Sequence, residues 1–105
     1  MRWQEGRQGS GYEKLPLLVG RRVDLYLLRF PTGSSVPMHR DPVDGLRHLR
    51  LNLILVPARR GGAFVCDAPI LDRPRIKLFR PDTCAHAVTP IEAGTRWVLS
   101  LGVAI

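Results

Sequence analysis

The longest regular alternation of hydrophobic and polar positions in the chain lies at residues 47–56, in the run RHLRLNLILV. Leucine occupies every second position, and the residues between the leucines are His48, Arg50, Asn52 and Ile54. Successive side chains of a strand point to opposite faces, so this period predicts a β-strand with one leucine face and one largely polar face. A polar residue on that second face needs either solvent or a ligand.

From residue 23 onward, similar short segments are separated by proline, glycine and aspartate. Their β-branched and aromatic residues predict strands at 23–30, 34–39, 63–67, 75–81, 84–91 and 95–105. The ARRGG run at 58–62 predicts a hairpin turn that returns the chain into the strand at 63–67. No longer segment has a helical period, so we expect an all-β chain with little or no helix.

The first 20 residues have a different texture, because they are polar and rich in glycine until the run LPLLV. They show no clear period, which predicts an irregular N-terminal arm at 1–20, followed by one β domain at 21–105. About seven or eight short strands at this spacing are typical of a sandwich or a barrel whose interior is filled by side chains around at most one pocket.

Length and composition narrow the class of protein further. A chain of 105 residues, 45% of them hydrophobic, predicts one small globular domain and is too short for Rossmann or TIM-barrel architectures. The sequence has no apolar run long enough to cross a bilayer, and MRWQEGRQGS lacks the apolar segment of a signal peptide, so we expect a cytoplasmic protein without a membrane partner. Cys66 and Cys84 lack C-x-x-C spacing, which favours reduced thiols.

The net charge of +7 comes almost wholly from arginine, since Lys14 and Lys77 are the only lysines. A basic surface attracts nucleic acid, anionic metabolites or acidic protein. The arginines are scattered along the chain rather than clustered, so a solvated basic surface remains the alternative interpretation.

Three residues with metal-binding side chains stand at the edges of predicted strands. His39 and Asp41 form an H-x-D pair, and two residues apart in extended backbone their side chains leave on the same side. His86 follows in a later strand. Two imidazoles and one carboxylate form the ligand set that leaves three coordination positions open, as in non-haem Fe(II) oxygenases. Ten residues after His86, Arg96 supplies a guanidinium that can pair with a carboxylate in bidentate fashion.

These residues resemble the 2-oxoglutarate and Fe(II)-dependent oxygenases, whose core is a double-stranded β-helix, also called a jelly roll and shared with cupin-like barrels. The resemblance covers roughly residues 23–104, through LRFPTGSSVPMHRD and RPDTCAHAVTPIEAGTRWVLSLG. It implies His39, Asp41 and His86 as iron ligands and Arg96 as the partner of the distal carboxylate of 2-oxoglutarate. It also implies hydroxylation or demethylation of a substrate with O2, while 2-oxoglutarate becomes succinate and CO2.

Further residues of the co-substrate pocket follow from the same resemblance. An early-strand tyrosine or polar residue often helps to hold 2-oxoglutarate, and the candidates here are Tyr26, Arg50 and Asn52. Many members carry a serine two residues after the arginine, where this chain has Val98, and Ser100 is the next residue on the same face. The prime substrate is left open as an anionic metabolite, an acidic peptide or a nucleic acid.

Two alternatives stand beside the oxygenase. A cupin-type metal protein has the same fold, and Gly33 with His39 and Pro81 with His86 match parts of its motifs, although Asp41 stands where a cupin has a further histidine and Asp44 and Gly45 stand where it has a glutamate. The other alternative is a non-catalytic basic β-barrel that binds a polyanion. A jelly roll without flanking helices has uncovered sheet faces and edges, so we expect a homodimer.

Overall fold

A computed structural model describes residues 2–6, 9–41 and 45–105, so that Asp44 lies outside the described residues. Within them the chain forms strands and no α-helix, which confirms the predicted all-β class. The strands are β1 (Gln4–Glu5), β2 (Glu13–Val19), β3 (Val23–Phe30), β4 (Val36–His39), β5 (His48–Val56), β6 (Arg60–Gly61), β7 (Phe64–Cys66), β8 (Leu71–Asp72), β9 (Ile76–Phe79), β10 (His86–Val88), β11 (Ile91–Ala93) and β12 (Arg96–Ala104). No helix in this part of the chain is long and apolar enough to span a membrane.

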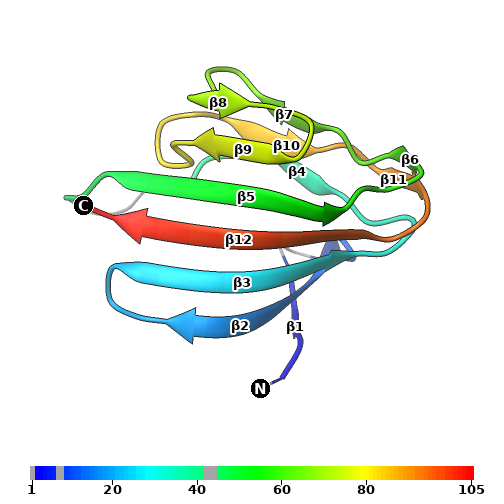
Figure 1. The fold of residues 1–105 in the computed structure, drawn as a ribbon, viewed down its shortest axis with the longest axis horizontal. Coiled ribbons are helices and arrows are strands. Elements are labelled where there is room, and N and C mark those ends of the chain that lie inside the picture. Colours follow the sequence, from blue (N-terminus) through cyan, green and yellow to red (C-terminus); the bar gives the residue numbers. More distant parts are fainter. Residues whose placement is uncertain (1, 7–8, 42–44) are drawn as a thin grey trace.

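The strands form one large antiparallel sheet and two small ones (Figure 1). The large sheet has the order β1-β2-β3-β12-β5-β9-β8, and the small sheets have the orders β4-β10-β7 and β11-β6. The core cluster draws its members from both sides, and they are Phe30, Val36, Ile54, Val88, Ile91 and Val98. The domain is therefore held together by apolar side chains that interlock between the facing sheets.

The prediction of an irregular arm at 1–20 is wrong for Glu13–Val19, which forms β2 and pairs along β3. Pro16 hides this strand in the sequence, because proline cannot donate a hydrogen bond to a neighbouring strand. The register of β2 against β3 shifts between Pro16 and Leu18, and β1 pairs with β2 only at Lys14 and Glu13. Proline is accommodated at such bulges and edges, so tertiary pairing outweighs the weak local pattern.

The predicted hairpin at 58–62 is also wrong, since β5 belongs to the large sheet and β7 to the three-stranded sheet. The chain instead crosses between the sheets, and β6 pairs with β11 on the way. Gly61 has φ +77°, and a Cβ there would collide with the backbone of Pro90. The glycines thus permit a close crossing rather than a two-residue turn.

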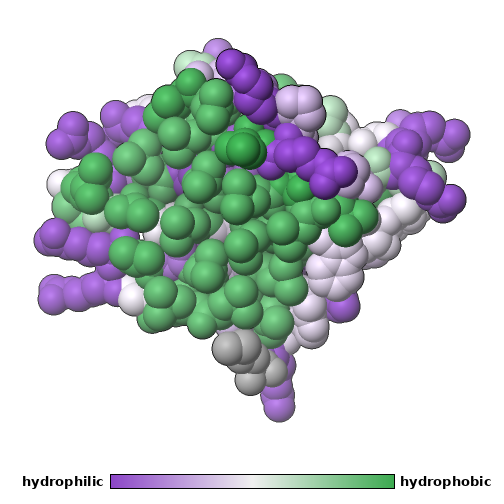
Figure 2. Space-filling model, viewed as in Figure 1, coloured by the Kyte–Doolittle hydropathy of each residue, from purple (hydrophilic) through white to green (hydrophobic). Residues whose placement is uncertain are grey.

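The two faces of the large sheet differ in composition, and the alternation at 47–56 runs through both. The outer surface of the large sheet is built by aliphatic residues that pair with one another across β2, β3, β12, β5, β9 and β8. We call this surface the leucine face, and it consists of Leu15, Leu18, Val23, Leu25, Leu27, Leu49, Leu51, Leu53, Leu71, Ile76, Leu78, Leu99, Leu101 and Val103. Figure 2 shows this face as a continuous hydrophobic surface. Arg50 and Asn52 of β5 turn the other way and line a cavity of about 460 Å3 between the sheets.

Candidate metal and ligand-binding site

His39 and His86 are brought together by the pairing of β4 with β10. They are direct partners in the antiparallel register, and their ring centroids are 4.3 Å apart. Directly opposed residues have their Cβ atoms about 4.5–5.5 Å apart, so two imidazoles at this position can reach one ion. The ring of Phe79 lies 4.9 Å from that of His86 and forms an apolar wall beside it.

Each imidazole is held by a carbonyl of its own strand or of the turn before it. Nδ1 of His39 lies 2.6 Å from the carbonyl oxygen of Pro37, and Nδ1 of His86 lies 3.0 Å from that of Cys84. A carbonyl accepts only, so Nδ1 carries a proton in both rings, and in the neutral form of each ring Nε2 has the lone pair that can bind a metal. This is the arrangement in which the outer hydrogen bond of a histidine orients it toward a metal.

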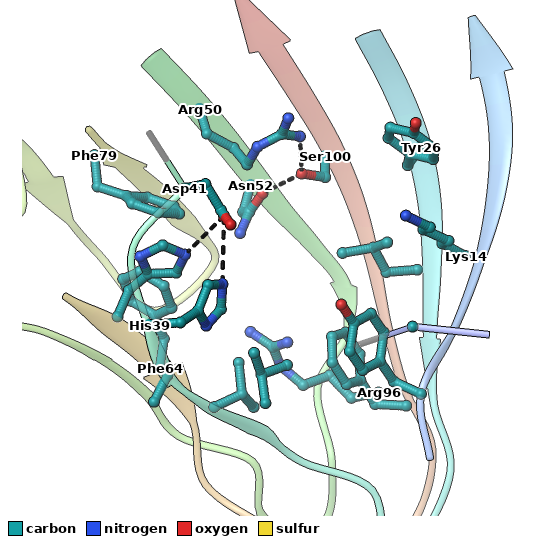
Figure 3. Close-up of a pocket in the computed structure, with 18 residues that line it drawn as sticks. Lys14, Tyr26, His39, Asp41, Arg50, Asn52, Phe64, Phe79, Arg96 and Ser100 are labelled. Atoms are coloured by element: carbon teal, nitrogen blue, oxygen red, sulfur yellow. Dashed lines mark hydrogen bonds and ion pairs between the residues drawn. The ribbon is translucent and has the colours of Figure 1, made fainter. Parts of the chain in front are cut away.

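Asp41 completes the group, because its Oδ2 lies 3.3 Å from Nε2 of His39 and 3.5 Å from Nε2 of His86 (Figure 3). The backbone N–H of Asp41 donates to the carbonyl of Pro81 at 2.6 Å, which ties the H-x-D segment to the turn before β10. Two imidazole nitrogens and a carboxylate oxygen thus converge on one point. This donor set fits a divalent cation such as Fe2+, Mn2+ or Zn2+, and a bound cation would supply Lewis acidity with coordination positions left open.

Arg96 reaches into the same cavity from the first position of β12 (Figure 3). Only 4% of its surface is exposed, and burial lowers its pKa to about 10, so the guanidinium stays charged at neutral pH. It lies over the ring of Phe30, with 5.0 Å between Cζ and the ring centroid. Among the described residues it has no hydrogen-bond or ion-pair partner, so its charge is left for an anion to neutralise.

Arg50 lines the cavity too, but its charge is already neutralised. It donates 2.8 Å and 3.0 Å hydrogen bonds to the two carboxylate oxygens of Asp24, and a 2.8 Å bond to Oγ of Ser100. Ser100 in turn donates to Oδ1 of Asn52 at 2.6 Å, which leaves the amide NH2 of Asn52 turned toward the cavity. Arg50 is therefore part of the wall, and the amide donor of Asn52 faces the cavity.

His48, at the start of β5, belongs to the same polar network. It is buried, its Nε2 lies 3.3 Å from Nη2 of Arg50, and its Nδ1 has no hydrogen-bond partner among the described residues. Burial, and then the charge of Arg50, lower the pKa of His48. A neutral histidine in this place serves the packing of the wall and does not line the cavity.

Solved structures of other proteins share this architecture. The chain matches the cupin domain of Cnp3 from Schizosaccharomyces pombe over its full length and 69% of that chain, with a TM-score of 0.72 and 9% identity. It matches an RmlC-like cupin protein from Desulfovibrio desulfuricans over 95% of its own length and 90% of that chain, with a TM-score of 0.62 and 17% identity.

The chain has the cupin fold. A third match is to the Rhodobacter sphaeroides complex of SigE with the anti-sigma ChrR, with a TM-score of 0.57, 24% identity, and coverage of 98% of this chain but only 48% of the matched one. No family model and no curated protein matches the sequence. The double-stranded β-helix implied by the oxygenase resemblance is thereby confirmed, while nothing in these matches points to a 2-oxoglutarate oxygenase in particular.

The cupin cavity brings together all seven residues that the sequence singled out, since each of them lines it: Tyr26, His39, Asp41, Arg50, Asn52, His86 and Arg96. Their roles toward a ligand stay predictions. The sequence did not point to Tyr12 and Lys14, because both lie in the segment 1–20 expected to be irregular. The alternation of Tyr12, Lys14 and Pro16 with Glu13 and Leu15 is the only local signal, and it is too short to stand out.

The two cysteines lie beside the site without joining it. Both thiols are free, and the thiol of Cys84 donates to the carbonyl of Ala68 at 3.2 Å. The sulfur atoms of Cys66 and Cys84 and the carboxylate of Asp67 form a second group of potential metal ligands, separate from the histidines. Burial raises the pKa of Cys66, which favours its protonated form. Any test of metal binding must therefore separate this group from the first.

Proposed function

We propose that this cupin domain binds a divalent metal through His39, Asp41 and His86, and a small carboxylate-bearing molecule that spans from the metal to Arg96. The observation that carries the proposal is the buried, unpartnered charge of Arg96 in the cavity that contains the histidines. A cation that is largely removed from bulk water without a counter-charge costs free energy in the apo-protein, and a ligand carboxylate lowers this cost.

The rest of the cavity suits the same class of ligand. The aromatic rings of Tyr12, Phe30, Phe64 and Phe79 exclude water from its walls, and Lys14 adds a second positive charge. A cavity of about 460 Å3 accommodates a metabolite but no folded chain. Exclusion of water strengthens the attraction between the guanidinium and a carboxylate, so a small dianion is favoured over a neutral molecule of the same size.

A second candidate is the Fe(II)- and 2-oxoglutarate-dependent dioxygenase. The observation that favours it is the donor set itself, because the third protein ligand is the carboxylate of Asp41 and not a further histidine. In this case 2-oxoglutarate is the dicarboxylate, Arg96 binds its distal end, and Asn52 and Tyr26 stand where they can contact it. A separate prime substrate is then needed, and it enters from the open side of the cavity.

The experiment is a titration of the apo-protein with Zn2+, Mn2+ and, without oxygen, Fe2+, followed by 2-oxoglutarate or succinate, with heat and thermal stability as readouts. The proposal expects one metal per chain, and carboxylate binding that requires both the metal and Arg96. His86→Ala removes the metal, Arg96→Met removes only the carboxylate, and Cys66→Ser is the matched control that removes a potential ligand from the second group.

Each outcome bears on one part of the proposal. Metal binding that is lost in Cys66→Ser but kept in His86→Ala contradicts the ligand assignment. Metal binding without any carboxylate binding contradicts the role of Arg96. A visible charge-transfer band that needs both Fe2+ and 2-oxoglutarate, together with succinate release in oxygen, supports the dioxygenase. Steeply salt-dependent binding of a DNA oligonucleotide without metal supports the basic binding module instead.

A further inference from the structure

The leucine face lies on the side of the large sheet that points away from the cavity. Fourteen aliphatic residues from six strands lie side by side on it (Figure 2), and the ion pair of Arg29 with Glu13 borders them at the end where β2 begins. At its margins Leu18 is 54% exposed and Val23 is 38% exposed. A sheet with one solvated face normally presents polar residues to water, and this one presents them to the interior. Such a surface marks a contact with another molecule.

We propose that the leucine face binds a second copy of this chain, sheet against sheet, and forms a twofold dimer with the two cavities on its outside. This proposal concerns the opposite side of the sheet from the metal site and does not depend on the proposed function. Two sheet faces pack about 10 Å apart with their strands within about 30° of each other, and apolar side chains interdigitate between them. A twofold interface uses the same patch on both subunits, and an aliphatic surface can pack against a copy of itself without any directional contact.

The size of the face agrees with what a stable dimer needs. Its five longer strands are spaced by about 4.8 Å, and seven residues, the length of β2, span about 23 Å, so the face measures roughly 550 Å2. Two such faces in contact bury roughly 1,100 Å2, before any contribution from the rims. Specific interfaces begin at about 1,000 Å2 in total, so the leucine face is large enough for a dimer at the lower end of this range.

The charges at the two ends of the strands select one orientation. Glu5 is paired with Glu13 across β1 and β2 at the end where β2 begins, and Arg29 neutralises the carboxylate of Glu13, so the acidic charge at this end comes from Glu5. Arg21 and Arg22 lie in the exposed turn between β2 and β3, at the other end. A twofold axis that runs across the strands places the acidic end of one copy against the basic turn of the other. An axis parallel to the strands would instead leave the two basic turns at the same end of the dimer, on opposite edges, where neither meets the acidic end of the other copy.

Residues of the leucine face point away from the core of the monomer, so the proposal can be tested by substituting one of them. Leu101 pairs with Leu25 and Leu51 in the middle of the face, and its side chain points away from the core. A lysine there keeps its charge in water in the monomer and buries it only in the dimer. Val65→Lys is the matched control, since Val65 is 39% exposed on a strand of the opposite sheet.

The experiment is sedimentation equilibrium of the unmodified chain, Leu101→Lys and Val65→Lys over a range of protein concentrations, with far-UV circular dichroism to check folding. We expect a dimer for the unmodified chain and for Val65→Lys, and a rise of the dissociation constant by about 30-fold or more for Leu101→Lys. A monomeric unmodified chain overturns the proposal, and so does a dimer that Leu101→Lys does not weaken.

A charge exchange tests the orientation and remains informative if Leu101→Lys does not fold. Glu5→Arg and Arg22→Glu are exposed substitutions, and within one chain the two positions lie at opposite ends of the same strand pair. Each alone should weaken the dimer by about 3- to 10-fold, and the double variant should restore it. The twofold axis across the strands is contradicted if the single variants leave the dissociation constant unchanged. It is also contradicted if the double variant dimerises more weakly than both single variants.

Discussion

The two faces of the large sheet are made by the same strands and carry opposite chemistry. On β12 the residues Arg96, Val98 and Ser100 turn inward, while Leu99 and Leu101 turn outward. The inward face combines the core with a polar cavity, and the outward face is aliphatic except near the start of β2, where Glu13, Arg29 and Trp97 lie on it. Polar residues are kept away from water only where they have partners or a ligand to meet. The hydrophobic pattern alone therefore does not tell which face of this sheet is inside, because the polar residues line the cavity.

The largest effect is expected when an imidazole of the inner face is removed. His86→Ala takes away one of three donors at a point where the other two cannot hold a cation alone, so metal affinity should fall by 100-fold or more, or about 3 kcal/mol. Calorimetric titration with Zn2+ measures this loss. The added thermal stability of the metal-loaded chain should disappear in His86→Ala and, on treatment with a chelator, in the unmodified chain as well.

Neighbouring residues of β12 lie on opposite faces of the sheet, and their substitutions should change the free energy of unfolding by different amounts. Val98 is 1% exposed and belongs to the core cluster, so Val98→Ala should lower the free energy of unfolding by about 2 kcal/mol. Leu99→Ala removes a larger side chain from the leucine face and should cost less than half as much in the monomer. Urea unfolding at a protein concentration below dimer formation makes the comparison, and equal costs would show that the leucine face is buried within the monomer.

Arg50 and Arg96 both line the cavity, and their substitutions should have different effects on the free energy of unfolding. Arg50→Met leaves Asp24 without its partner and should lower the free energy of unfolding by about 1–2 kcal/mol. Arg96→Met removes a buried cation that has no partner among the described residues, and should leave stability unchanged or raise it by up to about 1 kcal/mol. Thermal unfolding of the apo-protein checks both, and a loss of stability in Arg96→Met would assign that residue to the fold.

The smallest effect is expected at Ser100, which links Arg50 to Asn52. Ser100→Ala removes a hydroxyl that accepts one hydrogen bond and donates another, and should cost about 1 kcal/mol of unfolding free energy. The amide of Asn52 is then free to rotate, so carboxylate affinity should fall by a few-fold while metal affinity stays the same. Titration of the metal-loaded variant with succinate distinguishes this from a general loosening of the cavity, which would change both affinities.

The sequence predicted strands correctly where the run of strand-forming residues was long. The alternation at 47–56 and the β-rich run VDLYLLRF became β5 and β3. It failed at β2, where Pro16 interrupts the pattern, and at the Gly61–Gly62 crossing, where the same residues that make a hairpin make a passage between sheets. Short-range patterns report local backbone preference, and the choice of strand partner depends on contacts far away in the chain.

By itself the sequence determined the all-β class, the donor types at His39, Asp41 and His86, and the presence of a strand with one leucine face and one polar face. Only the tertiary structure decided that the polar face points inward, that the β4–β10 register sets two imidazoles opposite each other, and that Arg50 is paired while Arg96 is not. The physical reason is that a side chain's environment is made by strands distant in sequence. Periodicity specifies which residues share a face, and packing specifies what that face meets.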